Sequence, residues 1–220
     1  MRKYEVAVLA SIALLFLIGA YIYPAMPEEV ASHWNAQGQA NDYMPKFWGV
    51  FFVPLLSVFL AAIFLAIPRI DPLKKNIEQF RDEYEKFILI FFVFFIYVYL
   101  LTISWNLGYK FDMMVAINPG LAAIFFFSGS LMEKAKMNWF IGIRTPWTMS
   151  SERVWTKTHK IGGKLFKACG VISLAGILAG QYAVYFILVP ILLVTAYLFI
   201  YSYLEFQKEQ KEKGKKLKKR

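Results

Sequence analysis

The chain has 220 residues, of which 58% are hydrophobic and only 18% are charged. A soluble domain of this size would expose more apolar surface than water tolerates, so the composition excludes an ordinary soluble protein and indicates an integral membrane protein. The net charge of +10 is concentrated between and after the apolar runs, and the single cysteine, Cys169, excludes an intrachain disulfide and a cysteine-based zinc site.

Six apolar segments approach the roughly 20 residues that a helix needs to cross a bilayer. They are Tyr4 to Tyr23, Phe47 to Ile67, Phe87 to Leu107, Met113 to Met132, Leu165 to Gly180 and Tyr182 to Glu205. The fifth segment is short and rich in small residues, which suits close packing against neighbouring helices, and it leaves a count of five spans open. The sequence therefore predicts an all-α integral membrane protein, a bundle of about six transmembrane helices.

The basic residues predict the orientation, because Lys and Arg near helix ends are retained in the cytoplasm. With the N-terminus inside, all of the 25 Lys and Arg residues except Lys46 and Lys110 fall on the cytoplasmic side. Both termini are therefore expected in the cytoplasm. The expected parts are a first helical hairpin at 1–67 with an extracytoplasmic loop at 24–46, a cytoplasmic charged loop at 68–86, a four-helix region at 87–205 with a cytoplasmic loop at 133–164, and a basic cytoplasmic tail at 206–220.

The loop at 24–46 is the only outer loop long enough to hold a structure of its own. Pro27 at a first helical position, followed by two Glu residues near the positive end of the helix dipole, predicts a short helix through Trp34. In that helix Val30 and Trp34 would lie four residues apart on one side, where they can rest on the membrane surface.

The same loop holds His33, Asn35 and Asp42, which are candidates for a metal or peptide site. One His with scattered carboxylates has no recognised ligand spacing, so we expect no metal ion. A single His also gives little support for pH sensing. The alternative for Asn35, Gly38 and Asp42 is a role as turn and capping residues, to which short polar side chains and a glycine are suited.

The loop at 133–164 carries half of the six tryptophans of the chain. Tryptophan favours the membrane interface, where its ring is in an apolar layer and its N–H stays wet, so we expect this loop to lie against the bilayer. Ser150 or Ser151 can cap a following basic helix. That helix is expected to end at Gly162 and Gly163, before the fifth span.

Arg144 is the residue of this loop with the clearest capacity to bind a ligand. Thr145 precedes Pro146 and is therefore restricted to extended backbone, which predicts a rigid, non-helical turn that holds the guanidinium in place. A guanidinium fork suits a phosphate or a carboxylate, and anchoring to lipid headgroups is an equal alternative. Trp155 and His159 share a helix face, which is also explained by packing alone.

The rest of the chain carries no sign of catalysis. Residues 73–86 are expected to form a solvated, mixed-charge helix. The eight basic residues from Lys208 to Arg220 indicate contact with anionic lipid headgroups and not with nucleic acid, since no folded basic module accompanies them. No ionisable residue lies near the middle of a span, which disfavours coupled transport. Without a phosphate-cradling glycine loop, a nucleophile elbow or HExxH, we expect no enzyme and no cofactor.

Two segments resemble the signatures of SdpI-like membrane proteins: YPAMPEEVASHWNAQGQANDYMPK at 23–46 and NWFIGIRTPWTMSSERVWTKTHKIGG at 138–163. The first is similar to their N-terminal extracytoplasmic module of unknown function, and the resemblance extends from Tyr23 to about Gly176. The matching positions, which become the candidate binding residues, are His33, Asn35, Gly38 and Asp42 in the outer loop, and Asn138, Gly142, Arg144, Thr145, Pro146, Trp147, Trp155 and His159 in the inner loop.

The resemblance implies a six-span protein of the prokaryotic plasma membrane that gives immunity to, or senses, a secreted peptide toxin. It also implies two partners, the toxin outside and a transcriptional repressor that is drawn to the membrane inside. Two alternatives stay open: a transporter or lipid-handling protein for a small amphipathic molecule, and a membrane enzyme that uses His33 or His159.

Overall fold

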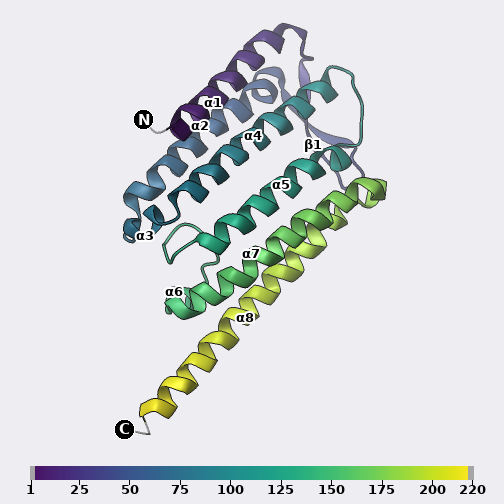
Figure 1. The fold of residues 1–220 in the computed structure, drawn as a ribbon. Helices are drawn as coiled ribbons and strands as arrows, with labels where there is room; N and C mark the ends of the chain where they lie inside the picture. Colours follow the sequence, from purple (N-terminus) through teal and green to yellow (C-terminus); the bar gives the residue numbers. More distant parts are fainter. Residues whose placement is uncertain (1–2, 218–220) are drawn as a thin grey trace.

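The computed structural model describes residues 3–217, so Arg2 and the last three residues of the predicted basic tail lie outside the described part. Six of the described helices are long and apolar enough to cross a membrane. They are α1 (Lys3–Ile22), α2 (Lys46–Ile70), α4 (Arg81–Asn106), α5 (Met113–Lys134), α7 (Glu152–Ala175) and α8 (Tyr185–Leu217). They lie side by side as a bundle from which the end of α8 projects (Figure 1). The predicted fold class and the count of six spans are confirmed.

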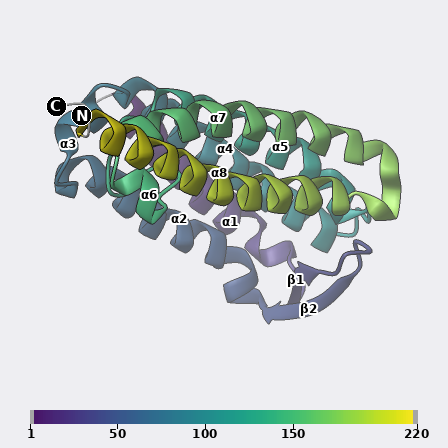
Figure 2. The ribbon, with the colours of Figure 1, turned by 90° about the horizontal axis from the view of Figure 1, so that it is seen from below.

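Short elements close the two ends of the bundle. They are the 3-10 turn η1 (Tyr23–Ala25), the strands β1 (Glu29–Trp34) and β2 (Ala40–Pro45), the helices α3 (Lys74–Glu78) and α6 (Pro146–Met149), and the 3-10 segment η2 (Gly176–Tyr182). Figure 2 shows α3, α6 and both chain ends together at one end, and the two strands at the other. We call these the terminal end and the hairpin end. Two termini at one end agree with an even number of spans, while the direction in which that end faces stays a prediction.

The outer loop forms a β-hairpin, so the predicted helix through Trp34 is wrong. β1 pairs with β2 in antiparallel register, with Val30 opposite Met44. The side chain of Asn106 on α4 explains why the extended form is preferred, since its Oδ1 accepts from the N–H of Ala31 at 2.7 Å and its Nδ2 donates to the carbonyl of Ala31 at 3.1 Å. β1 thus pairs with β2 along one edge, and on its other edge both backbone groups of Ala31 are bonded to Asn106.

The predicted mixed-charge helix at 73–86 is also wrong in detail, because it is not continuous: the helix is interrupted between α3 and α4. α3 ends at Glu78 and α4 begins at Arg81. The intervening Phe80 is only 3% exposed and belongs to the apolar core. Burying this ring requires a change of direction that a continuous solvated helix would not allow, so tertiary packing overrides the local helical pattern.

In the core between α1, α2 and α4, two tyrosines of α4 donate hydrogen bonds to backbone carbonyls of α2 that prolines leave without a partner. Pro54 and Pro68 lie inside α2, and each lacks the N–H that would bond the carbonyl four residues earlier. Those carbonyls belong to Val50 and Phe64, and α4 supplies the missing donors. The hydroxyl of Tyr99 donates to the carbonyl of Val50 at 2.9 Å, and the hydroxyl of Tyr84 donates to that of Phe64 at 2.8 Å.

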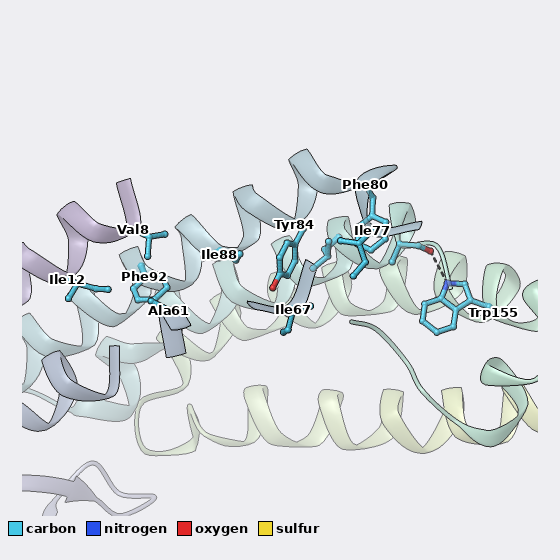
Figure 3. Close-up of a cluster of buried hydrophobic side chains, with 12 residues drawn as sticks. Val8, Ile12, Ala61, Ile67, Ile77, Phe80, Tyr84, Ile88, Phe92 and Trp155 are labelled. Atoms are coloured by element: carbon cyan, nitrogen blue, oxygen red, sulfur yellow. Dashed lines mark hydrogen bonds between the residues drawn. The ribbon is translucent and has the colours of Figure 1, made fainter. Parts of the chain in front are cut away.

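Tyr84 is 2% exposed and belongs to a continuous apolar cluster. Figure 3 shows this cluster running along α4, from Phe92 past Ile88 and Tyr84 towards Trp155 at the terminal end. In a bilayer an unpaired carbonyl has no water to bond, so these two tyrosine hydroxyls allow α2 to carry prolines within a span.

α7 begins where the sequence predicts and ends beyond it. The Oγ of Ser151 accepts from the N–H of Val154 at 3.3 Å, which confirms the predicted serine cap. The helix then continues through Gly162 and Gly163, so the predicted end at these glycines is wrong. Their function is close packing, because a Cβ on Gly163 would collide with the backbone carbonyl of Gly129 on α5.

The same close approach recurs seven residues further along, where a Cβ on Gly170 would lie 2.7 Å from the carbonyl oxygen of Ala122 on α5. This confirms that small residues of the fifth span serve helix packing. After α7 the chain continues as η2 and turns into α8 at Gly180, whose φ of +54° suits glycine.

Candidate functional site

The loop between α5 and α7 folds around the side chain of Asn138, which is completely buried. Its Oδ1 accepts from the N–H groups of Phe140 at 2.9 Å and Ile141 at 2.6 Å. Its Nδ2 donates to the carbonyls of Lys136 and Ile141, both at 2.9 Å. The amide therefore directs its full hydrogen-bonding capacity to the backbone of its own loop, and it shapes the loop without presenting a group to a ligand.

His159 fixes the next part of the loop from α7. Its Nε2 accepts from the N–H of Ile143 at 2.9 Å, and its Nδ1 lies 2.9 Å from the carbonyl oxygen of Trp155. This network requires a neutral ring with its proton on Nδ1. Gly142 has a φ of +113°, and a Cβ there would collide with the imidazole. Trp155 stacks on the ring with 3.9 Å between centroids and donates its Nε1–H to Ala135 at 2.8 Å.

The segment Thr145–Pro146 joins the loop to α8. Thr145 has the predicted extended backbone, with φ −93° and ψ 162°, and it forms a capping box with Thr148. The Oγ of Thr145 also lies 3.1 Å from the Oγ of Ser202 on α8, and both hydroxyls are buried. The ring of Trp147 packs against two aromatic rings of α8. These residues therefore dock the loop on the last helix.

Arg144 differs from these neighbours because its guanidinium is exposed. Its Nη1 donates to the carbonyl of Trp139, at 2.5 Å, which holds the side chain across the loop. Trp139 is itself 53% exposed. Among the eight inner candidates, Arg144 is thus the one that offers a charge to a partner, and the backbone around it is non-helical, as predicted.

Two residues that the sequence did not single out also hold this loop. The buried carboxylate of Asp71 accepts from the N–H of Trp139 at 2.9 Å and from the N–H of Leu73 at 2.6 Å. The Nδ2 of Asn76 donates to the carbonyl of Met137 at 2.7 Å. The Asp-Pro pair at 71–72 is a turn signal in the sequence. The contact of Asp71 with Trp139 cannot be predicted from any local pattern, because the two residues are almost seventy positions apart.

The four outer candidates do not converge on a common point. Asn35 organises the hairpin turn, since its Oδ1 accepts from the N–H groups two and four residues further on, both at 3.0 Å. Gly38 has a φ of +72°, as a turn glycine can, and its Cα faces Asp112. Asp42 accepts from the next backbone N–H, and His33 lies 2.6 Å from the Oδ1 of Asn41. Within residues 3–217 no three His, Cys, Asp or Glu residues are grouped to hold a metal ion.

His33 does, however, line an apolar groove of about 420 Å³ at the hairpin end. The groove lies between β1, α2, α4 and α5, and most of its surface is apolar. Its walls include Trp34, Met44, Trp48, Phe52, Val98, Thr102, Met113 and Ile117. Sequence reasoning found the histidine but missed the groove, because the hairpin residues are completed by walls from three separate spans, α2, α4 and α5.

Comparisons with known proteins match both halves of the chain. Residues 134–202 match the model of the SdpI/YfhL protein family, and residues 10–58 match a domain of unknown function, DUF1648. The chain is 25% identical over 209 residues to immunity protein SdpI of Bacillus subtilis (strain 168), covering 94% of this chain and 98% of the relative. No solved structure matches. The SdpI/YfhL match contains the loop around Arg144 and the DUF1648 match contains the hairpin. The chain is therefore a multi-pass cell membrane protein that is similar to immunity protein SdpI along almost its whole length.

Proposed function

We propose that this protein is a membrane immunity protein that protects the cell against a secreted, membrane-active peptide and senses its presence. The observation that carries the proposal is the similarity to immunity protein SdpI along 94% of the chain. The hairpin end is the receiving side in this proposal, with the apolar groove as the site where the peptide binds.

The chemistry of the groove supports a cationic, amphipathic peptide as ligand. Trp48 and Phe52 offer aromatic surface for apolar side chains. Glu29 and Asp42 are exposed on the hairpin beside it, and Glu28 is paired with Lys46 at 3.3 Å. A surface with excess carboxylates attracts basic peptides and raises their local concentration.

Contacts along the bundle support a path by which binding is reported at the terminal end. α5 lines the groove and packs closely against α7, which in turn contacts α8. α8 runs from the hairpin end past the loop of Arg144 and projects beyond it (Figure 1). It is bonded to that loop through Ser202 and to α7 through the pair Glu205–Lys157 at 2.6 Å. A change in the tilt of α8 would therefore move the loop, and the loop is the part that would meet a cytoplasmic repressor.

Protection is tested in a Bacillus subtilis strain that lacks its own immunity protein SdpI. The chain is expressed in this strain. Survival is measured first in co-culture with the wild-type strain and then in the presence of a panel of cationic, membrane-active peptides. Trp48→Ala and His33→Ala, which alter the groove, should reduce protection at equal membrane levels. Tyr43→Ala is the matched control, because this hairpin residue is 51% exposed and lies outside the groove lining.

Survival no better than that of empty-vector cells would reject the immunity function. Equal protection by all three variants would reject the groove as the binding site. Flux of a peptide or another amphipathic molecule into vesicles that contain the purified chain would instead favour a transporter.

A further inference from the structure

A rigid loop at the terminal end exposes two aromatic rings beside a fixed arginine. Trp139 is 53% exposed and Phe140 is 39% exposed, and the exposed guanidinium of Arg144 lies against the Trp139 carbonyl. We call these three residues the aromatic tip. Their side chains contribute little to the core, so the reason for their arrangement lies outside the chain.

The backbone of the aromatic tip is held from three sides. Asp71 accepts the N–H of Trp139, Asn138 accepts the N–H of Phe140, and Arg144 donates to the carbonyl of Trp139. A mobile loop could turn its apolar rings away from water, but this loop is bonded in a form that keeps them exposed. Such pre-organisation reduces the entropy that binding a ligand would cost.

The position and charge of the aromatic tip favour one ligand. α5 ends at Lys134, so the tip follows within a few residues of the end of a span and lies where lipid headgroups begin. Lys134 and Lys136 are exposed at the end of α5 and in the segment between α5 and α6. Each also shares a surface hollow with carboxylates of other segments, so Arg144 is the main positive charge of the aromatic tip. The neighbouring Glu133 is paired with Lys167 at 2.7 Å, so its charge is balanced within the bundle.

The geometry points to a binding site for the headgroup of an anionic phospholipid at the aromatic tip. Arg144 binds the lipid phosphate through the N–H groups that do not face Trp139, since guanidinium has five donors in a planar fork. Trp139 and Phe140 insert between the headgroups, where an aromatic ring finds apolar contact and a polar boundary together. Through Asn138 and Asp71 the bound lipid stabilises the loop that α8 contacts.

Lipid retention by the purified full chain tests this site. The protein in neutral detergent is incubated with equal amounts of phosphatidylglycerol and phosphatidylcholine of the same acyl chains, and bound lipids are counted by native mass spectrometry. Wild type should retain mainly phosphatidylglycerol. Arg144→Gln should lower that preference about fivefold, the factor that one basic residue contributes near an anionic surface. Lys160→Gln removes an equal charge from an exposed position on α7 and should leave the preference unchanged.

Trp139→Ala provides a second test, because it keeps the backbone contacts with Asp71 and Arg144. It should weaken retention of both lipids. An equal preference in wild type and Arg144→Gln would overturn the site, and so would the absence of any preference in wild type, even if Arg144→Gln failed to fold. Displacement of phosphatidylglycerol by inorganic phosphate would show that a soluble anion, and not a lipid, is the ligand. These outcomes are independent of the protection assay.

Discussion

The pairing of Tyr99 with the carbonyl of Val50 predicts a specific double-mutant result. Tyr99→Phe removes the hydroxyl that donates to this carbonyl at 2.9 Å, and Pro54 provides no N–H in its place. The carbonyl is then buried without a partner, because both Val50 and Tyr99 are 0% exposed. Leaving one buried polar group unsatisfied costs about 1–3 kcal/mol, so Tyr99→Phe should lower the free energy of unfolding by about that amount.

Pro54→Ala should remove most of this penalty, because alanine restores the N–H that the helix lacks at this position. In the Pro54→Ala background, Tyr99→Phe should therefore cost about 1–2 kcal/mol less than in wild type, a coupling well above the roughly 0.5 kcal/mol expected for independent sites. The four proteins are compared by reversible unfolding in detergent micelles. Additive effects of the two substitutions would refute the hydrogen-bond argument for the prolines of α2.

Three further predictions concern the loop and the hairpin. Gly142→Ala should destabilise the protein by about 1–3 kcal/mol more than Gly108→Ala. Both glycines have φ above +100°, but only a Cβ on Gly142 would collide with another group. Equal melting temperatures of the two variants would contradict this prediction. Asp71→Ala should free the loop and increase limited proteolysis between α5 and α7, while the spans stay intact on the same gel. Asn106→Ala should speed hydrogen exchange at the amide of Ala31 by at least about tenfold, and unchanged protection there would show that α4 does not hold the hairpin.

The spans could be read from the sequence because the length of an apolar run is a local property that the bilayer thickness fixes. The turn at Thr145 and the cap at Ser151 were predictable for the same reason, since each depends on one or two neighbouring residues. The inner candidates also proved to lie in, or to pack against, one folded loop, with Trp155 and His159 contributed by α7, but the sequence does not show their hydrogen-bond partners. Asn138 and His159 bond to backbone groups whose position depends on how the loop closes.

The wrong predictions share a physical cause. The residues after Pro27 favour a helix locally, yet they form β1 because Asn106, far along the chain, completes the hydrogen bonding of an extended strand. Gly163 is a helix-end signal in the sequence, but in the fold it allows α7 to pack closely against α5. The groove at the hairpin end could not be predicted for a related reason, since its walls come from the hairpin and from three separate spans.

The sequence by itself determined that this is a membrane protein of about six spans with two conspicuous loops, because hydrophobic length, charge and turn residues act over short distances. Only the tertiary structure decided that one loop is a β-hairpin over an apolar groove and that the other exposes Arg144 and two aromatic rings from a rigid frame. These features depend on contacts such as Asp71 with Trp139, and hydrogen bonds between distant segments exist only once the helices have packed.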